Sequence, residues 1–137
     1  MRSLIINFRI DDGSGGFASP SITFDRTIVS EYVVLKRVSI TTRDYSSSDY
    51  HRIIGIKLPF LNLITNTGSY SKLNTIAVTL PKDDAVSYVC NEMYPVVGKK
   101  ISDFNVTLFD YNGANSSNVP NHCYISLTFE IDDVGAL

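Results

Sequence analysis

The fold is decided by residues 122–132, HCYISLTFEID, where apolar and polar side chains alternate without a break. One set of alternate positions is entirely apolar and consists of Cys123, Ile125, Leu127, Phe129 and Ile131. The positions between them are mostly polar. Because successive side chains of a strand point to opposite sides, this pattern predicts a β-strand with one buried face and one wetted face.

The same period of two recurs along most of the chain, and helical spacing is almost absent. Counting the alternating segments predicts about eight strands, joined by turns rich in Gly, Ser, Asn, Asp and Pro. The expected strands are residues 4–10, 20–25, 32–42, 51–58, 74–80, 86–91, 101–109 and 123–131. We therefore expect an all-β protein, an antiparallel two-sheet sandwich of jelly-roll or immunoglobulin-like kind. No repeat or linker divides residues 1–137, so we expect a single domain.

Two of these strands are less regular than the others. In residues 32–42 the apolar face is interrupted by Lys36, and a β-bulge between Leu35 and Arg37 would restore the phase. Residues 85–92 fit a strand, but Asp83 and Asp84 could also begin a single helical turn there.

Composition limits the possible partners. The chain has 137 residues, 19% of them charged, a formal net charge of −2 and a pI of about 5.5. Nucleic-acid binding needs clustered Lys and Arg, so we expect no nucleic-acid partner. No apolar run approaches the length of a membrane span, and we expect a soluble protein made inside the cell.

The two cysteines and two histidines do not form a catalytic or metal-binding pattern. His122 and Cys123 are neighbours on a predicted strand, so their side chains would project to opposite faces and could not pair as base and nucleophile. Cys90 and Cys123 are expected to be reduced, core-packed thiols, although a single disulfide between them stays open. His51 is too isolated to complete a zinc site with them. The expected catalytic, cofactor and metal residues are therefore none.

Several loop motifs have an ordinary structural explanation. Residues 110–113, Asp-Tyr-Asn-Gly, begin like a calcium loop, but Gly113 and Asn121 fall where an EF-hand would not place them. Weak calcium binding by loop carboxylates is left open for Asp11, Asp12, Asp83 and Asp84. The Gly-rich residues 13–16 lack the lysine and helix of a phosphate loop. Glycosylation patterns at Asn105 and Asn115 are attributed to chance.

Tyrosines are concentrated in predicted loops and at strand edges: Tyr45, Tyr50, Tyr70, Tyr94 and Tyr111. Such tyrosines can stack on sugars or bases, and they also favour contacts between proteins. With no Trp and few charges, we expect a protein interface, as in a packed assembly subunit.

Three stretches carry a resemblance to a known family: residues 21–24 leading through Ser30 to 31–40, residues 101–113, and residues 122–132. In these the chain resembles the single jelly-roll capsid proteins of icosahedral double-stranded DNA viruses. It is most similar to the penton or minor capsid proteins of virophages, polinton-like viruses and adintoviruses. The resemblance is one of pattern over most of the chain, without a diagnostic motif.

The resemblance implies an eight-stranded jelly roll made of two four-stranded sheets. The first, eighth, third and sixth predicted strands would share one sheet, and the second, seventh, fourth and fifth the other. The core would then contain Phe24, Ile40, Ile54, Ile56, Val78, Phe104, Val106, Leu108, Ile125, Leu127 and Phe129. The implied function is a structural capsid subunit without catalytic activity or cofactor. It would be made in the host cell, form a homopentamer at each fivefold vertex of the virion, and contact the major capsid protein.

One alternative remains: a ligand-binding β-sandwich, such as a carbohydrate-binding module that uses loop tyrosines. An enzyme on a jelly-roll scaffold is disfavoured, because its metal site would need clustered histidines.

Overall fold

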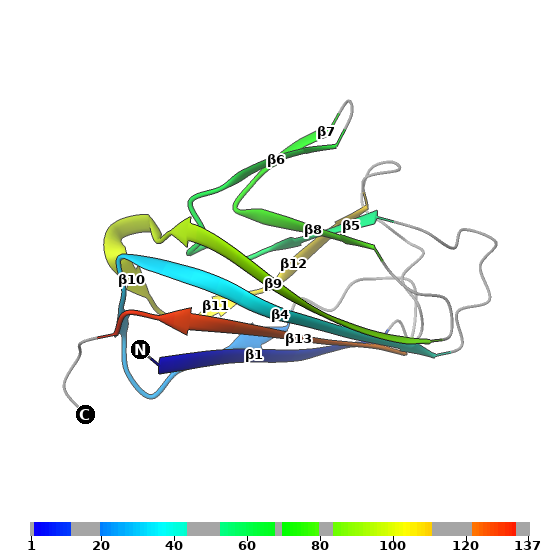
Figure 1. The fold of residues 1–137 in the computed structure, drawn as a ribbon, viewed down its shortest axis with the longest axis horizontal. Coiled ribbons are helices and arrows are strands. Elements are labelled where there is room, and N and C mark those ends of the chain that lie inside the picture. Colours follow the sequence, from blue (N-terminus) through cyan, green and yellow to red (C-terminus); the bar gives the residue numbers. More distant parts are fainter. Residues whose placement is uncertain are drawn as a thin grey trace.

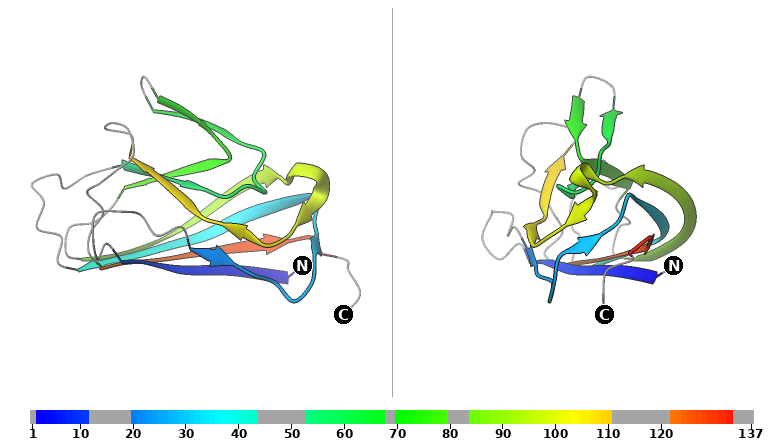
Figure 2. Two further views of the ribbon diagram at one scale, coloured as in Figure 1. Left: turned by 180° about the vertical axis from the view of Figure 1, so that it is seen from behind. Right: turned by 90° about the vertical axis from the view of Figure 1, so that its left-hand side faces the viewer.

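The computed structural model describes residues 2–11, 20–43, 53–67, 70–79, 84–110 and 122–133. These residues form antiparallel β-sheets and one short 3₁₀ turn. Figures 1 and 2 show two layers of strands, with the start of the first strand and the end of the last strand at the same end of the molecule.

One layer is a four-stranded sheet in the order β1-β13-β4-β9. Its strands are long: β1 is Arg2–Asp11, β13 is His122–Ile131, β4 is Tyr32–Arg43 and β9 is Ala85–Pro95. The two outer strands, β1 and β9, each have one sheet neighbour among the described strands.

The opposite layer is more broken. It contains a three-stranded sheet in the order β12-β5-β8, formed by Thr107–Asp110, Ile53–Lys57 and Thr75–Thr79. The pair β11 (Phe104–Asn105) and β2 (Ser21–Ile22) lies beside it in the same layer (Figure 2).

Smaller elements complete the fold. At the end near the termini, β3 (Ile28–Val29) pairs with β10 (Lys100–Ile101), directly after the 3₁₀ turn η1 (Val97–Lys99). A hairpin of β6 (Ile64–Thr67) and β7 (Tyr70–Leu73) projects from the body between β5 and β8 (Figure 1).

The expected grouping of strands is confirmed for one layer. In the other layer, the strands expected to form one four-stranded sheet are divided into the three-stranded sheet β12-β5-β8 and the separate pair β11-β2. The first, eighth, third and sixth predicted strands correspond to β1, β13, β4 and β9, in that spatial order. In the other layer the second pairs with the seventh, the seventh with the fourth, and the fourth with the fifth. The bulge is confirmed as well, because the register between β4 and β9 shifts between Leu35 and Arg37. The alternative of a helical turn at residue 85 is wrong, since Ala85 begins β9.

Two strand predictions need correction. Residues 101–109 are not one strand but are divided among β10, β11 and β12. With the unpredicted strands β3, β6 and β7, the described residues hold thirteen strands. At the break, residues 103–106 bond to a segment distant in sequence: the Val106 N–H donates to the Pro20 carbonyl at 2.8 Å, and the Asp103 carboxylate accepts the Phe24 N–H at 2.7 Å. The hairpin β6–β7 was not predicted.

The hydrophobic core lies between the two layers and contains most of the predicted residues. Those buried are Ile40, Ile54, Ile56, Val78, Val106, Leu108, Ile125, Leu127 and Phe129. Phe24 and Phe104 were predicted to be core, but they are only partly buried against it, because they lie on the short β2–β11 side of the sandwich. Phe60 bridges these regions, with its ring 5.4 Å from that of Phe104 and 5.8 Å from that of Phe129.

In the described part of the chain, no helix is long and apolar enough to cross a membrane.

Candidate functional site

Neither cysteine is placed for nucleophilic chemistry. Cys123 lies on β13 within the core, where burial raises the pKa of its thiol to about 12. Cys90 is partly buried on β9; burial and the charge of Glu92 raise the pKa of its thiol, while Lys36 opposes that shift. Both are free thiols. Since the thiolate is the reactive form, both environments disfavour reaction.

The structure brings none of the remaining polar candidates together as a site. His122 pairs with Arg43 along the sheet, and His51 lies outside the described residues. Within the described ranges, no group of three or more His, Cys, Asp or Glu could hold a metal ion.

The loop carboxylates are only partly placed. Asp84 uses its carboxylate to accept the N–H of Ala85 at 2.7 Å, which fixes the start of β9. Asp11 and Asp110 end β1 and β12, and the Gly-rich residues 13–16, with Asp12 and Asp83, lie outside the described residues. Asn105 accepts a hydrogen bond from the Ser21 hydroxyl at 2.8 Å, across the β2–β11 pair. Asn115 lies outside the described residues.

The tyrosine surface stays a prediction. Tyr45, Tyr50 and Tyr111 lie outside the described residues. Tyr70 pairs with Thr67 at the tip of the β6–β7 hairpin. Tyr94 is half-buried, and its hydroxyl donates to the Glu92 carboxylate; burial first, and then this bond, raise the pKa of that tyrosine.

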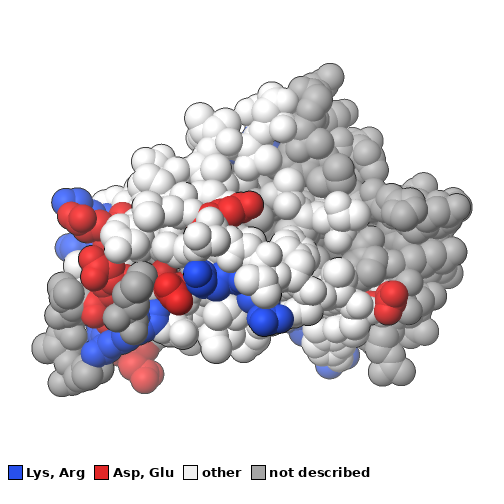
Figure 3. All heavy atoms as spheres, in the orientation of Figure 1, with Lys and Arg blue, Asp and Glu red and all other residues white. Residues whose placement is uncertain are grey.

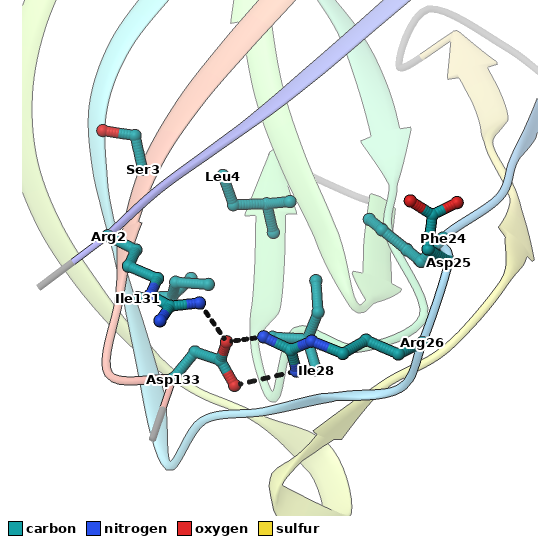
Figure 4. A pocket seen from close by; sticks show the side chains of 9 residues that line it. All are labelled: Arg2, Ser3, Leu4, Phe24, Asp25, Arg26, Ile28, Ile131 and Asp133. Atoms are coloured by element: carbon teal, nitrogen blue, oxygen red, sulfur yellow. Dashed lines mark hydrogen bonds and ion pairs between the residues drawn. The ribbon is translucent and has the colours of Figure 1, made fainter. Parts of the chain in front are cut away.

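A pocket of about 200 Å³ opens at the end of the molecule near the termini (Figure 4). Its polar side is held by Asp133, whose side chain is only 2% exposed. This carboxylate accepts hydrogen bonds from Arg26, from the Arg2 guanidinium at 3.4 Å and from the Val29 N–H at 3.3 Å. Two guanidinium groups therefore neutralise the acid, and the cluster ties the segment after β13 to β1 and to the β2–β3 connection.

Beside this cluster, hydrogen bonds of Ser30 also link β4 to the segment after β13. The Ser30 hydroxyl donates to the Tyr32 carbonyl at 2.6 Å and accepts the Asp132 N–H at 2.9 Å. Lys99 and Glu31 form an exposed ion pair nearby at 3.2 Å. Figure 3 shows charged side chains gathered at this end, with a few more acidic and basic side chains in the middle of the visible face. The charges of this end thus serve mainly to hold the segments together.

The most extended candidate surface is the outer face of the four-stranded sheet. No described element covers it (Figure 2). The register places the following residues on this face: Ser3, Ile5, Asn7 and Arg9 of β1; Tyr124, Ser126, Thr128 and Glu130 of β13; Arg37, Ser39 and Thr41 of β4; and Ala85, Ser87, Val89, Asn91 and Met93 of β9. Small hydroxyl side chains dominate the middle of the face.

Side chains on this face are tied to one another. The hydroxyls of Ser39 and Ser87 lie 2.9 Å apart, and Arg37 donates to Ser87 at 3.0 Å. At the β1 side, the Arg9 guanidinium stacks over the Tyr124 ring at 5.2 Å. The face combines small hydroxyl side chains with a few charged ones, among them Arg9, Arg37 and Lys36, whose ammonium group donates to Asn91 at 2.9 Å. Such a mixed surface suits contact with another protein better than binding of a small molecule.

The β9 edge of the sheet is apolar. Of the large hydrophobic side chains exposed among the described residues, four lie on β9, more than on any other strand: Val86, Tyr88, Val89 and Met93. Val89 is 71% exposed and Met93 is 64% exposed. Sequence reasoning identified this segment only as a strand, because alternation alone does not show whether a strand is central or at an edge.

Comparisons with known proteins add little. No protein-family model matches the chain, and no curated protein matches it. Among solved structures, a chain of "Structure of infectious bursal disease virus Gx strain" is similar over 99% of this chain and 33% of that chain, with 13% identity and a TM-score of 0.43. This chain thus spans about a third of the length of that one, and a likeness of this size does not bear on function.

Proposed function

We propose that this chain is a structural subunit of an icosahedral virus capsid, built as a single jelly roll and acting by self-association. The observation that carries the proposal is the order of the strands. A jelly roll consists of eight strands in two interlocked Greek keys and is common in viral capsid proteins. The order β1-β13-β4-β9 in one layer, with the pairs β2–β11, β12–β5 and β5–β8 in the other, is the order expected of that fold.

The surface supports an assembly role over a catalytic one. In the part of the chain that the structure describes, no element covers the outside of the sheet between β1 and β9, and the two edges of that sheet are open. A subunit that works alone in solution gains nothing from long unprotected edges, because these invite uncontrolled pairing. A subunit of a shell can cover them with its neighbours.

In this proposal the subunit occupies the fivefold vertices as a pentamer, touches the surrounding major capsid protein and has no enzymatic activity. A contact between two different patches of identical chains closes into a ring when the rotation per copy fits. The resemblance to penton proteins favours five copies over other numbers.

Electron microscopy of the purified chain at high concentration tests the proposal. We expect closed rings of uniform diameter, because the proposed pentamer forms by contacts between copies of this chain alone. Separate single particles the size of one domain would contradict the self-association. Open filaments of varied length would contradict the vertex assignment, because their rotation per copy does not close.

A further inference from the structure

We infer that the copies join edge to edge, with β9 of one chain pairing antiparallel with β1 of the next, so that the four-stranded sheets form one continuous sheet. This inference rests on the proposed self-association and names its interface. The partner is a second copy of this chain, and the recognising groups are the free backbone edges together with the side chains beside them.

The two edges have compatible directions. Neighbouring strands are antiparallel throughout the order β1-β13-β4-β9, so β1 and β9 run in opposite directions. A second copy in the same orientation can therefore place its β1 beside β9 of the first and continue the antiparallel pattern. The lengths also match, with ten residues in β1 and eleven in β9.

Neither edge carries Lys or Pro in its middle, and the irregularity of β9 is limited to the register shift against β4 between Val89 and Glu92. Edge strands are commonly guarded by Lys, Pro or inward charges. From Ala85 to Tyr94, β9 has neither Lys nor Pro, and its one charge is Glu92. The charges of β1 are confined to its ends, at Arg2, Arg9 and Asp11.

The exposed apolar side chains of both edges point to the same side of the sheet. Ile5 of β1 is 55% exposed on the outer face, where Val89 and Met93 of β9 also lie. In the chain itself, Ile5, Thr128, Arg37 and Val89 form one row across the sheet. If that row continues into the next copy, Val89 meets Ile5 of the neighbour and both lose their exposed apolar surface.

This register pairs the other positions favourably as well. Asn7 would lie opposite Ser87, and Ser3 opposite Asn91, so polar side chains meet on the outer face. Arg2 would lie opposite Glu92 at the end near the termini, which brings opposite charges together. Shifting the register by two residues in either direction places Ile5 against Asn91 or Ser87 and loses these matches.

Paired cysteines test the register directly. In a Cys90→Ser background, the chain with Ile5→Cys and Val89→Cys is oxidised with copper phenanthroline and air, and its products are separated without reductant. Within one chain these positions are three strand spacings apart, roughly 14 Å, so they cannot bridge internally. The matched control carries Ile5→Cys and Ser87→Cys, two residues out of register on the same strand and face.

We expect a ladder of dimers, trimers and larger linked species from the Val89 pair, at least about tenfold stronger than from the Ser87 pair, because cross-strand neighbours two residues apart are too distant for a disulfide. Neither single cysteine should give more than background. Equal ladders, or none, in a chain that still forms multimers by mass would overturn this interface and leave self-association standing. No ladder in a chain that stays monomeric would overturn both.

Discussion

Replacing Phe129 by alanine is expected to remove most of the stability of the fold. Phe129 is fully buried near the C-terminal end of β13, where it pairs with Leu4 of β1 and Leu35 of β4 and meets the Phe60 ring edge-on at 5.8 Å. Phe→Ala changes in a packed core cost about 3–5 kcal/mol. Small domains have a free energy of unfolding of about 5–15 kcal/mol, so Phe129→Ala should leave only a small part of it.

Urea unfolding followed by circular dichroism measures this loss. Tyr124→Ala is the matched control, because Tyr124 lies on the same strand but points outward. That change removes its contact with the Arg9 guanidinium, and we expect it to cost no more than about 1 kcal/mol. A loss below about 1 kcal/mol for Phe129→Ala would mean that the two layers do not enclose this side chain.

The protein is expected to lose stability steeply as pH rises above 9. The Cys123 thiol has a pKa of about 12 in the folded chain, against an ordinary 9.0. Between these values the unfolded chain releases the proton and the folded chain keeps it. The folded state is therefore favoured fully below pH 9, and each further pH unit removes about 1.4 kcal/mol up to pH 12.

Cys123→Ala should reduce the loss of unfolding free energy per pH unit above pH 9, whatever its effect on stability at neutral pH. Cys90→Ala is the comparison, because Cys90 is only partly buried and should change the slope less. Tyr88 and Tyr94, whose pKa values burial also raises, account for the slope that remains. The prediction fails if urea unfolding from pH 8 to 11 gives parallel curves for wild type and Cys123→Ala.

Most of the main sheet was predictable, because its strands have one face on the core. The alternation from Cys123 to Ile131 identified β13, and the interruption at Lys36 identified the bulge of β4. The expected strand order came from the resemblance and agrees with the pairing in both layers.

The sequence did not reveal the elements that have no face packed against the core. The β6–β7 hairpin pairs Thr65 with Lys72 and Asn66 with Ser71, so no apolar alternation marks it. Its exposed apolar pair, Ile64 and Leu73, lies only at its base. Likewise, the division of residues 101–109 depends on hydrogen bonds from distant partners such as Pro20, and these leave no local pattern.

The protein interface expected from the sequence stays a prediction, and the structure offers a different surface for it. Low charge and many tyrosines predicted a protein interface, yet the loop tyrosines that led to it were not the residues that define the apolar edge. Val86, Val89 and Met93 resemble core residues in sequence. Their exposure follows from the position of β9 at the margin of the sheet, a tertiary property.

The most direct test of self-association through the sheet edge is the mass of the untagged chain by light scattering over a range of concentrations. We expect a plateau near five times the 15.2 kDa of one chain. Val89→Lys should weaken association at least about tenfold, because pairing would bury an unpartnered charge. Ile64→Lys, at an equally exposed apolar site on the hairpin, should leave the plateau unchanged. A mass of 15.2 kDa for the wild-type chain at every concentration would contradict the account.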